Sequence, residues 1–219
     1  MRASPVAVVT SPTAYRATRT PRAAVRPDPA GSTWQDGAVP HELFGSLDTA
    51  PALGRPDLLA PVTLAVLERT GLEALVAAID PTLADTEQLC AHYGVPLDAS
   101  ANAVVVRGTR AGVDSHVVCM VRATDRLDVN GLIRKRLGAR KASFAPMDFA
   151  VEATGMEYGG INPIGVPADW PIWVDGAVAD TDWVCIGSGI RASKLFVPVT
   201  TLLALPGAER VDDLARPAG

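Results

Sequence analysis

The sequence lacks the features that mark several classes of protein. No apolar run reaches the ~18 residues that a membrane-spanning helix needs, so we expect no membrane partner. The three histidines have neither HExxH nor HxH spacing, which argues against a catalytic metal. The cysteines, Cys90, Cys119 and Cys185, have no CxxC spacing and lie in apolar runs. Free thiols in a reducing cytosol fit this pattern better than disulfides or zinc. We therefore expect a cytoplasmic protein that holds neither a metal nor a cofactor.

Common catalytic and nucleotide-binding motifs are also missing. The chain has no G-x-S-x-G nucleophile elbow and no P-loop lysine motif. Three glycines lie between Gly155 and Gly160, but they follow a predicted helix rather than a strand, so they do not fit a dinucleotide-binding turn. The net charge of −4 argues against a general polyanion binder. Any contact with nucleic acid must therefore be a local patch.

Length and composition indicate one domain with an extension. The chain has 219 residues, of which 48% are hydrophobic, enough for a substantial core. Residues 1–45 contain scattered prolines, and five arginines precede the first acid, Asp28. That composition suits a transit peptide, a disordered tail or a start codon assigned too early. We predict a disordered or mis-started extension over 1–45 and a single domain over 46–219.

Hydrophobic periodicity predicts a mixture of helices and strands in that domain. Helices are expected over 57–69, 85–93, 128–137, 146–155 and 199–205, and capping or glycine signals bound the first four. Asp85 or Thr86 would cap the second. Strands are expected over 75–79, 171–174, 183–186 and 194–197, and a hairpin over 101–106 and 115–121. The elements do not alternate regularly. The pattern therefore predicts an α+β fold with a mixed, mostly antiparallel, barrel-like sheet and surrounding helices.

The segment Thr154–Pro167 is unusually rich in residues that shape the backbone. It holds four glycines and two prolines in fourteen residues. Glycine permits positive φ and close backbone approach, and proline fixes φ. Such a loop could present its N–H and C=O groups to a ligand, or it could be a tight surface connection.

A basic run follows the predicted helix over 128–137. It contains no acid and consists of Arg134, Lys135, Arg136, Arg140 and Lys141. Cations at a helix C-terminus are stabilising by about 0.3–1 kcal/mol each, which could be their whole purpose. They could also contact the phosphates of a nucleic acid.

Four motifs in order resemble the YbaK/EbsC family of aminoacyl-tRNA editing domains. The segment Gly155–Gly165 resembles the family's signature loop, and Leu127–Lys141 resembles its L-D helix followed by G-A-K-K. Pro171–Asp175 resembles its strand ending in Asp, and Ile186–Arg191 resembles its glycine-rich turn. The resemblance covers roughly residues 80–205.

The resemblance implies a compact α+β domain that hydrolyses the ester joining a wrong amino acid to the 3′ acceptor end of tRNA. Characterised members act in trans or as inserted domains of prolyl-tRNA synthetase, so a synthetase is a further candidate partner. A second hydrolytic site makes physical sense, because binding discriminates one methylene by only about 1–3 kcal/mol. The family's terminal ribose hydroxyl is thought to assist, so no dedicated protein base is implied.

The resemblance also assigns candidate residues. Backbone groups of the loop would hold the ester carbonyl and a water, and the catalytic candidates are Gly159, Gly160, Ile161, Pro163 and Asn102. Candidates for binding the substrate are Tyr158, Asn162, Asp175, Gly187, Ser188, Gly189 and Lys194. The basic run becomes a candidate tRNA contact. Four aromatic residues flank the loop and could stack the terminal adenine, wall an amino-acid pocket or pack in the core: Phe144, Tyr158, Trp170 and Trp173.

Three positions depart from the family pattern. Asn102 stands where active members carry a lysine, and Gly187 stands where they often have serine, with Ser188 adjacent. An acid of some members aligns with Lys194, which could supply the missing cation from another strand. Two hypotheses follow. The first is a free-standing, metal-free aminoacyl-tRNA deacylase. The second is a non-catalytic module of the same fold that binds tRNA, a synthetase or a small ligand.

Overall fold

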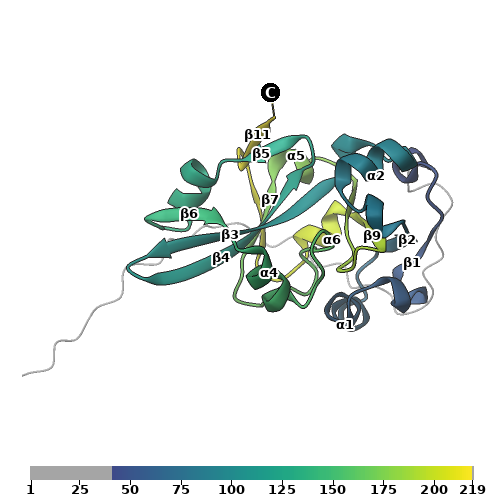
Figure 1. Cartoon of the computed structure of the whole chain (residues 1–219), viewed down its shortest axis with the longest axis horizontal. Helices are drawn as coiled ribbons and strands as arrows, with labels where there is room; N and C mark the ends of the chain where they lie inside the picture. The colour runs from purple at the N-terminus through teal and green to yellow at the C-terminus, as the bar shows by residue number, and fades with distance from the viewer. Residues whose placement is uncertain (1–40, 219) are drawn as a thin grey trace, which may run out of the picture. The chain divides into compact units, whose positions relative to one another are not determined.

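Two sheets form the centre of the part of the chain that the structure, a computed structural model, describes, residues 41–218 (Figure 1). The five-stranded sheet has the order β10 (Ala208–Val211), β7 (Ile172–Asp175), β4 (Val113–Arg122), β3 (Ala101–Arg110) and β6 (Lys141–Phe144). Its β10, β7 and β4 are parallel, and β3 is antiparallel to both β4 and β6. The antiparallel four-stranded sheet has the order β1 (Thr49–Pro51), β2 (Leu75–Ala78), β9 (Ser193–Pro198) and β8 (Trp183–Gly187). A two-stranded sheet pairs β11 (Ala215–Pro217) with β5 (Asp125–Leu127).

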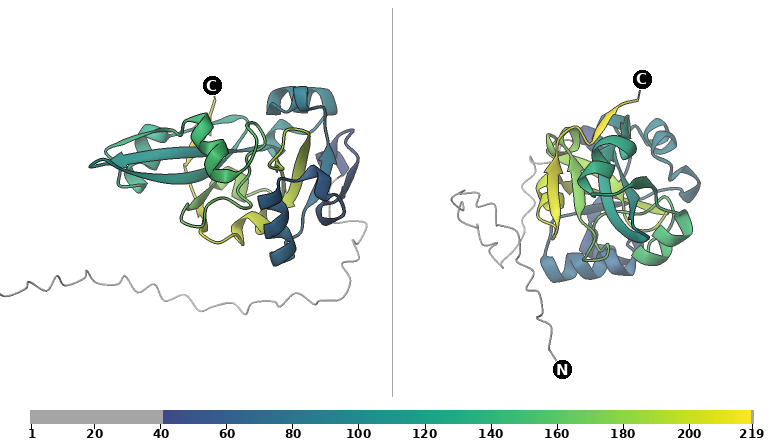
Figure 2. Two further views of the ribbon diagram at one scale, coloured as in Figure 1. Left: turned by 60° about the horizontal axis from the view of Figure 1, so that its bottom comes forward. Right: turned by 90° about the vertical axis from the view of Figure 1, so that its left-hand side faces the viewer.

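The α+β class is confirmed, but the expected barrel-like closure is wrong. In the described chain the outer strands of each sheet do not pair with one another, so both sheets end in open edges. The β3–β4 hairpin, drawn in teal, extends away from the four-stranded sheet in Figure 1 and in the left view of Figure 2. One side of β3 is covered by β6 over only part of its length, from Val106 to Thr109. On this side, residues 101–104 of β3 pair with no described strand, although Ser100, just before β3, forms an isolated parallel bridge with Cys185 of β8.

The helices are short and lie between and around the strands. The longer ones are α1 (Pro61–Thr70), α2 (Thr86–Tyr93) and α4 (Met147–Thr154), which end at glycines with positive φ, as the sequence signals predict. The predicted helix over 128–137 is instead a π-helical turn, η6 (Val129–Ile133), followed by α3 (Arg134–Arg136). The remaining short helices are η1 (His41–Phe44), η2 (Ala52–Gly54), η3 (Pro56–Leu58), η4 (Pro81–Leu83), η5 (Leu97–Ala99), α5 (Gly176–Ala179) and α6 (Val199–Leu203).

The core follows from the alternation of side chains along the strands. On β3, Val105 belongs to a cluster that also contains Ile186 and Leu195 from the other sheet, so this cluster joins the two sheets. Its neighbour Val106 belongs to a different cluster, with Ile133 of the π-helical turn. Both faces of the five-stranded sheet are thus buried over part of their area. This double burial fixes the position of β3, which carries part of the candidate site.

The packed region begins before residue 46. Leu43 and Phe44 are only 5% and 8% exposed and pack in a cluster with Leu89 and Phe196. The rings of Phe44 and Phe196 meet edge to face, 5.0 Å between centroids. The predicted boundary after residue 45 therefore falls within the packed region. The rest of the predicted extension, residues 1–40, lies outside the described residues.

Phe44→Ala should destabilise the domain markedly. Removing a buried aromatic ring costs about 3 kcal/mol or more, because transfer energy is lost and a cavity remains. That loss corresponds to a fall in melting temperature of roughly 6–12 °C for a domain of this size. Thermal unfolding followed by circular dichroism measures it, with Leu53→Ala as the control, since Leu53 is 49% exposed. Equal melting temperatures for the two variants would show that the segment is not part of the cooperative core.

Candidate functional site

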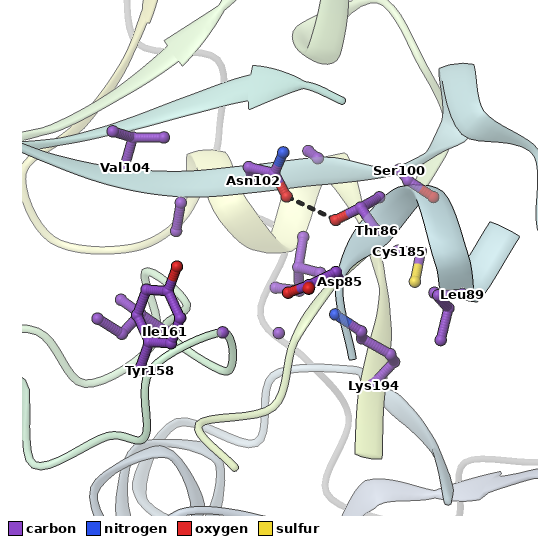
Figure 3. A pocket seen from close by; sticks show the side chains of 15 residues that line it. Asp85, Thr86, Leu89, Ser100, Asn102, Val104, Tyr158, Ile161, Cys185 and Lys194 are labelled. Carbon is purple, nitrogen blue, oxygen red and sulfur yellow. Dashed lines mark hydrogen bonds between the residues drawn. The ribbon is translucent and has the colours of Figure 1, made fainter. Parts of the chain in front are cut away.

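A cavity of about 320 Å³ lies where the two sheets meet (Figure 3). Four segments form its walls: the start of α2, the start of β3, the glycine loop after α4, and the facing strands β8 and β9. Of the predicted site residues, it brings together Asn102, Tyr158, Gly159, Ile161, Gly187 and Lys194. These residues are far apart in the sequence, and only the packing of the two sheets makes them neighbours.

Lys194 is the most unusual side chain of the cavity. It extends from β9 toward Asp85 and is only 5% exposed (Figure 3). Its Nζ donates a hydrogen bond of 2.8 Å to the carbonyl of Ala84, and no described carboxylate lies within ion-pair distance. Burial lowers the pKa of the Lys194 ammonium, whereas the Cys185 and Cys90 thiols and the Asp85 carboxylate act in the opposite direction. A buried cation without a carboxylate partner is costly to keep, so it points to a functional role.

The opposite wall presents polar groups from α2 and β3. The hydroxyl of Thr86 donates a hydrogen bond of 2.8 Å to Oδ1 of Asn102. This bond orients the Asn102 amide and leaves its two N–H groups as donors beside the cavity. Asp85, the residue before α2, lines the cavity, and its carboxylate makes no capping bond to the helix. The sequence predicted Asp85 and Thr86 only as helix caps, so their place in the site was missed.

Cys185 also lines the cavity, but its thiol is unreactive. Burial raises the pKa of the Cys185 thiol to about 12, so the group remains protonated at neutral pH. Cys90 and Cys119 are likewise free thiols. Among the described residues, no three His, Cys, Asp or Glu side chains gather to hold a metal ion.

The glycine loop enters the cavity through a tight turn. The N–H of Gly160 donates to the carbonyl of Glu157 at 2.9 Å, and Gly159 has φ of 79°, as the third residue of a type II turn requires. Because the N–H of Gly160 closes this turn, it cannot also hold an ester carbonyl. The role that the resemblance implied for this N–H group is therefore not supported. The N–H groups of Gly159 and Ile161 have no partner among the described residues, and both residues line the cavity. These two are the better candidates for an oxyanion site.

The loop is fixed to the turn after β8 from several sides. The N–H of Gly189 donates to the carbonyl of Gly160 at 2.7 Å, and the carboxylate of Glu157 accepts from the N–H of Arg191 at 2.7 Å. The Arg191 side chain donates to the carbonyls of Tyr158 and Pro81. Glu157 and Arg191 were not predicted site residues. Their contribution is to hold the loop, and no spacing in the sequence indicated that pairing.

Several predicted site residues support the fold instead of lining the cavity. Asn162 is fully buried; its amide donates to the Thr63 hydroxyl at 3.1 Å and accepts from the Ile164 N–H at 2.7 Å. The Ser188 hydroxyl is buried against Ser193, 2.7 Å away. Pro163 and Gly189 are buried outside the cavity wall. Direct contact of these residues with substrate is not supported, because neighbouring protein groups surround them.

Asp175 is likewise a structural residue. It is 4% exposed, and its carboxylate accepts from the N–H of Ala177 at 2.9 Å and from the N–H of Ala215 at 3.0 Å. These bonds cap α5 and fix the C-terminal strand. The predicted contact of Asp175 with substrate is therefore replaced by a role in holding two chain segments together.

The basic run divides into two groups. Arg136 pairs with Glu209 at 2.7 Å and stacks over the ring of Trp173, and the Arg134 side chain donates to the Asn130 carbonyl. Lys135, Arg140 and Lys141 are exposed, and their side chains have no partner among the described residues. The four aromatic residues that flank the loop also form two groups, which differ in burial. Trp170 and Trp173 are buried, whereas Tyr158 and Phe144 are exposed.

Comparison with known proteins identifies the family to which the chain belongs. The family model for the aminoacyl-tRNA editing domain matches residues 80–205, which carry every wall of the cavity. The chain belongs to the aminoacyl-tRNA editing domain family. Membership indicates a role in aminoacyl-tRNA editing in general. No curated protein sequence matches the chain.

Solved structures agree with the fold of an aminoacyl-tRNA editing domain. Hypothetical protein APE2540 is 20% identical, with a TM-score of 0.62 over 71% of this chain and 99% of that chain. A protein described as a proposed trans-editing enzyme for prolyl tRNA synthetase is 21% identical, with a TM-score of 0.59 over 70% of this chain and 97% of that chain. At these identities the similarity extends to the fold alone. Among the described residues of this editing domain, no helix is long and apolar enough to span a bilayer.

Proposed function

We propose that this editing domain is a free-standing deacylase that hydrolyses the ester between a wrong amino acid and the 3′-terminal ribose of tRNA. The observation that carries the proposal is the cavity itself. It is lined by Lys194, whose side chain is buried, and by Gly159 and Ile161, whose backbone N–H groups have no partner among the described residues. A cation and backbone N–H donors can stabilise a developing oxyanion. A cytoplasmic location and a transient encounter with a synthetase belong to this proposal.

The reaction needs few protein groups. Water adds to the ester carbonyl carbon, the oxyanion is held by the N–H groups, and collapse breaks the bond to the ribose oxygen. That oxygen takes a proton, and the products are a free amino acid and tRNA. The ribose hydroxyl next to the ester can assist the proton transfer, so the absence of a histidine among the cavity-lining residues is no obstacle. Lys194 would add its positive charge to the N–H groups that stabilise the oxyanion.

The decisive test is hydrolysis of mischarged tRNAs by the purified chain. We expect release of amino acid above the spontaneous rate for at least one pairing in a panel of small amino acids. Binding of the same tRNAs, measured in parallel, separates the two hypotheses. Tight binding with no hydrolysis across the panel would overturn the deacylase proposal and favour a non-catalytic module, as the replacement of the family lysine by Asn102 first suggested.

Asn102→Ala should weaken the site without abolishing it. The amide contributes one or two neutral hydrogen bonds, each of about 0.5–1.5 kcal/mol. We therefore expect kcat/KM to fall roughly tenfold. Thr86→Val should have a smaller effect, because it removes only the hydrogen bond that orients the amide. Steady-state deacylation of the best substrate measures both variants. An unchanged rate for Asn102→Ala would remove this residue from the site.

A further inference from the structure

A second hollow lies next to the cavity, along the part of β3 that β6 does not cover. It has a volume of about 180 Å³, and none of its lining residues carries a charge. Ala103, Val104, Tyr158 and Ile161 line both hollows, so the two are adjacent. Phe144 and Met147 form the outer wall. This apolar groove is not needed for the ester chemistry proposed above, and its role is therefore open.

The groove exposes large apolar side chains in one place. Phe144 is 61% exposed, Met147 is 52% exposed and Tyr158 is 58% exposed. Single exposed apolar residues need no explanation, but a group of them beside a cavity marks a binding surface. Two of the three are aromatic rings, which can stack on the faces of nucleobases.

Cations lie beyond the groove, at the far end of β6. This edge strand runs from Phe144 to Lys141, which lies opposite Thr109 of β3, and it contains no acid. Arg140 precedes it, and its N–H donates to the carbonyl of Thr109 at 2.9 Å. Both basic side chains are exposed and have no partner among the described residues. Thr109 lies six positions after Ala103 along β3, so about 20 Å separates the cavity wall from these cations.

We propose that the groove and the adjoining cations form a track for the single-stranded 3′ end of the RNA substrate. The terminal nucleotide enters the cavity, the preceding bases lie on Phe144 and Met147, and the phosphates further along meet Arg140 and Lys141. The order of these features supports this occupant over a protein partner. Apolar contacts lie next to the cavity and cations lie farther out, as required by a single strand whose last base enters the cavity and whose earlier phosphates lie outside it. The identity of the RNA in this proposal rests on the proposed function, whereas the binding of RNA does not.

The track predicts different roles for the basic side chains. Arg136 is held by Glu209 and Trp173, so its guanidinium is already engaged. Arg140 and Lys141 are free to meet phosphate. The track therefore predicts that Arg140 and Lys141 contribute strongly to RNA affinity, whereas Lys135 and Arg136, which line a different hollow with Arg210, do not.

The test uses a short single-stranded RNA that ends in CCA and carries no amino acid. Its binding to the full chain is followed by fluorescence anisotropy at several salt concentrations. Phe144→Ala with Met147→Ala should weaken binding about tenfold, the loss expected for one or two stacked bases. Arg140→Gln with Lys141→Gln should also weaken binding and should lower the salt slope by about 1.4, since each phosphate contact on a single strand contributes about 0.7. The controls are Leu53→Ala and Arg69→Gln, which change exposed residues on other elements.

Two ester substrates test whether the track affects hydrolysis only through the binding of RNA. Both double variants should lower kcat/KM for aminoacyl-tRNA and leave hydrolysis of a minimal aminoacyl-adenosine ester at the parental level. Equal losses on both esters, or RNA affinity and salt slope matching the parent, would overturn the track. If the parent chain does not bind the RNA, the track is also wrong and the exposed groove is better explained as a protein-docking surface. If the RNA binds through these residues and neither ester is hydrolysed, the track stands and the deacylase proposal fails.

Discussion

Lys194→Met is expected to reduce deacylation by about 100-fold or more, the usual effect of removing one donor that stabilises a developing oxyanion. The same change should leave the melting temperature unchanged or raise it. Methionine fills a similar volume, and replacing a buried charge by an apolar group is often neutral or stabilising. The Ala84 carbonyl loses its donor, but the cost of holding a buried ammonium disappears. Loss of activity together with retained stability is the signature of a residue kept for function.

The measurements are kcat/KM on the best mischarged tRNA and thermal unfolding of both proteins. Lys135→Met is the matched control, because Lys135 is exposed and does not line the cavity. It should change neither the activity nor the melting temperature appreciably. Parental kcat/KM in Lys194→Met would show that the cavity works without its cation, and the proposed role of Lys194 would then be wrong.

The pH dependence of Lys194→Met follows from the lowered pKa of this lysine. Between the folded-state pKa and the unfolded value near ~10.4, the unfolded chain binds more protons than the folded chain, so parental stability rises with pH in that window. The relative gain of Lys194→Met should therefore be largest below the folded-state pKa and should shrink as pH rises toward ~10. In the parent, activity above the spontaneous rate should decline as the lysine loses its proton. That decline should occur at a lower pH than an ordinary lysine would give.

The sequence predicted the parts of this fold that bury an apolar face. The strands with Val105 and Val118 and the helices that end at Gly71 and Gly94 lie where periodicity and glycine signals placed them. The edge strands β1, β6 and β10 were missed because they bury little, whereas the edge strand β8 is buried and was predicted. For example, Lys141–Phe144 is almost entirely exposed and shows no apolar alternation.

The sequence predicted only part of the site, and the physical reason differs from the one that applies to the edge strands. Asn102 and Lys194 belong to different sheets, and no spacing predicts that they share a cavity. The resemblance supplied them as separate motif positions. It could not distinguish residues that face the cavity from residues that hold its walls. Asn162 and Asp175 have the polar side chains of a binding site, but protein N–H and hydroxyl groups satisfy them in the interior.

Gly187→Ala is expected to disturb the site through the contact between β8 and the glycine loop. A Cβ at Gly187 would overlap the carbonyl oxygen of Gly160 and would lie 2.8 Å from the carbonyl oxygen of Ile161. Both contacts are with backbone, which cannot rotate away as a side chain can. The loop must therefore move relative to β8, and the N–H groups of Gly159 and Ile161 move with it. A displacement of about 1 Å at a catalytic group can cost on the order of 100-fold in rate.

The variant should also lose some stability, because adding a methyl group to a tightly packed contact costs about 1–3 kcal/mol. For a domain of this size the melting temperature should fall by roughly 2–12 °C. Gly54→Ala is the matched control: the same methyl group meets nothing within 4 Å there, and the glycine does not have positive φ. Deacylation and thermal unfolding are measured for both variants. A Gly187→Ala protein that hydrolyses mischarged tRNA at the parental rate would show that the loop tolerates displacement and that its N–H groups do not hold the oxyanion.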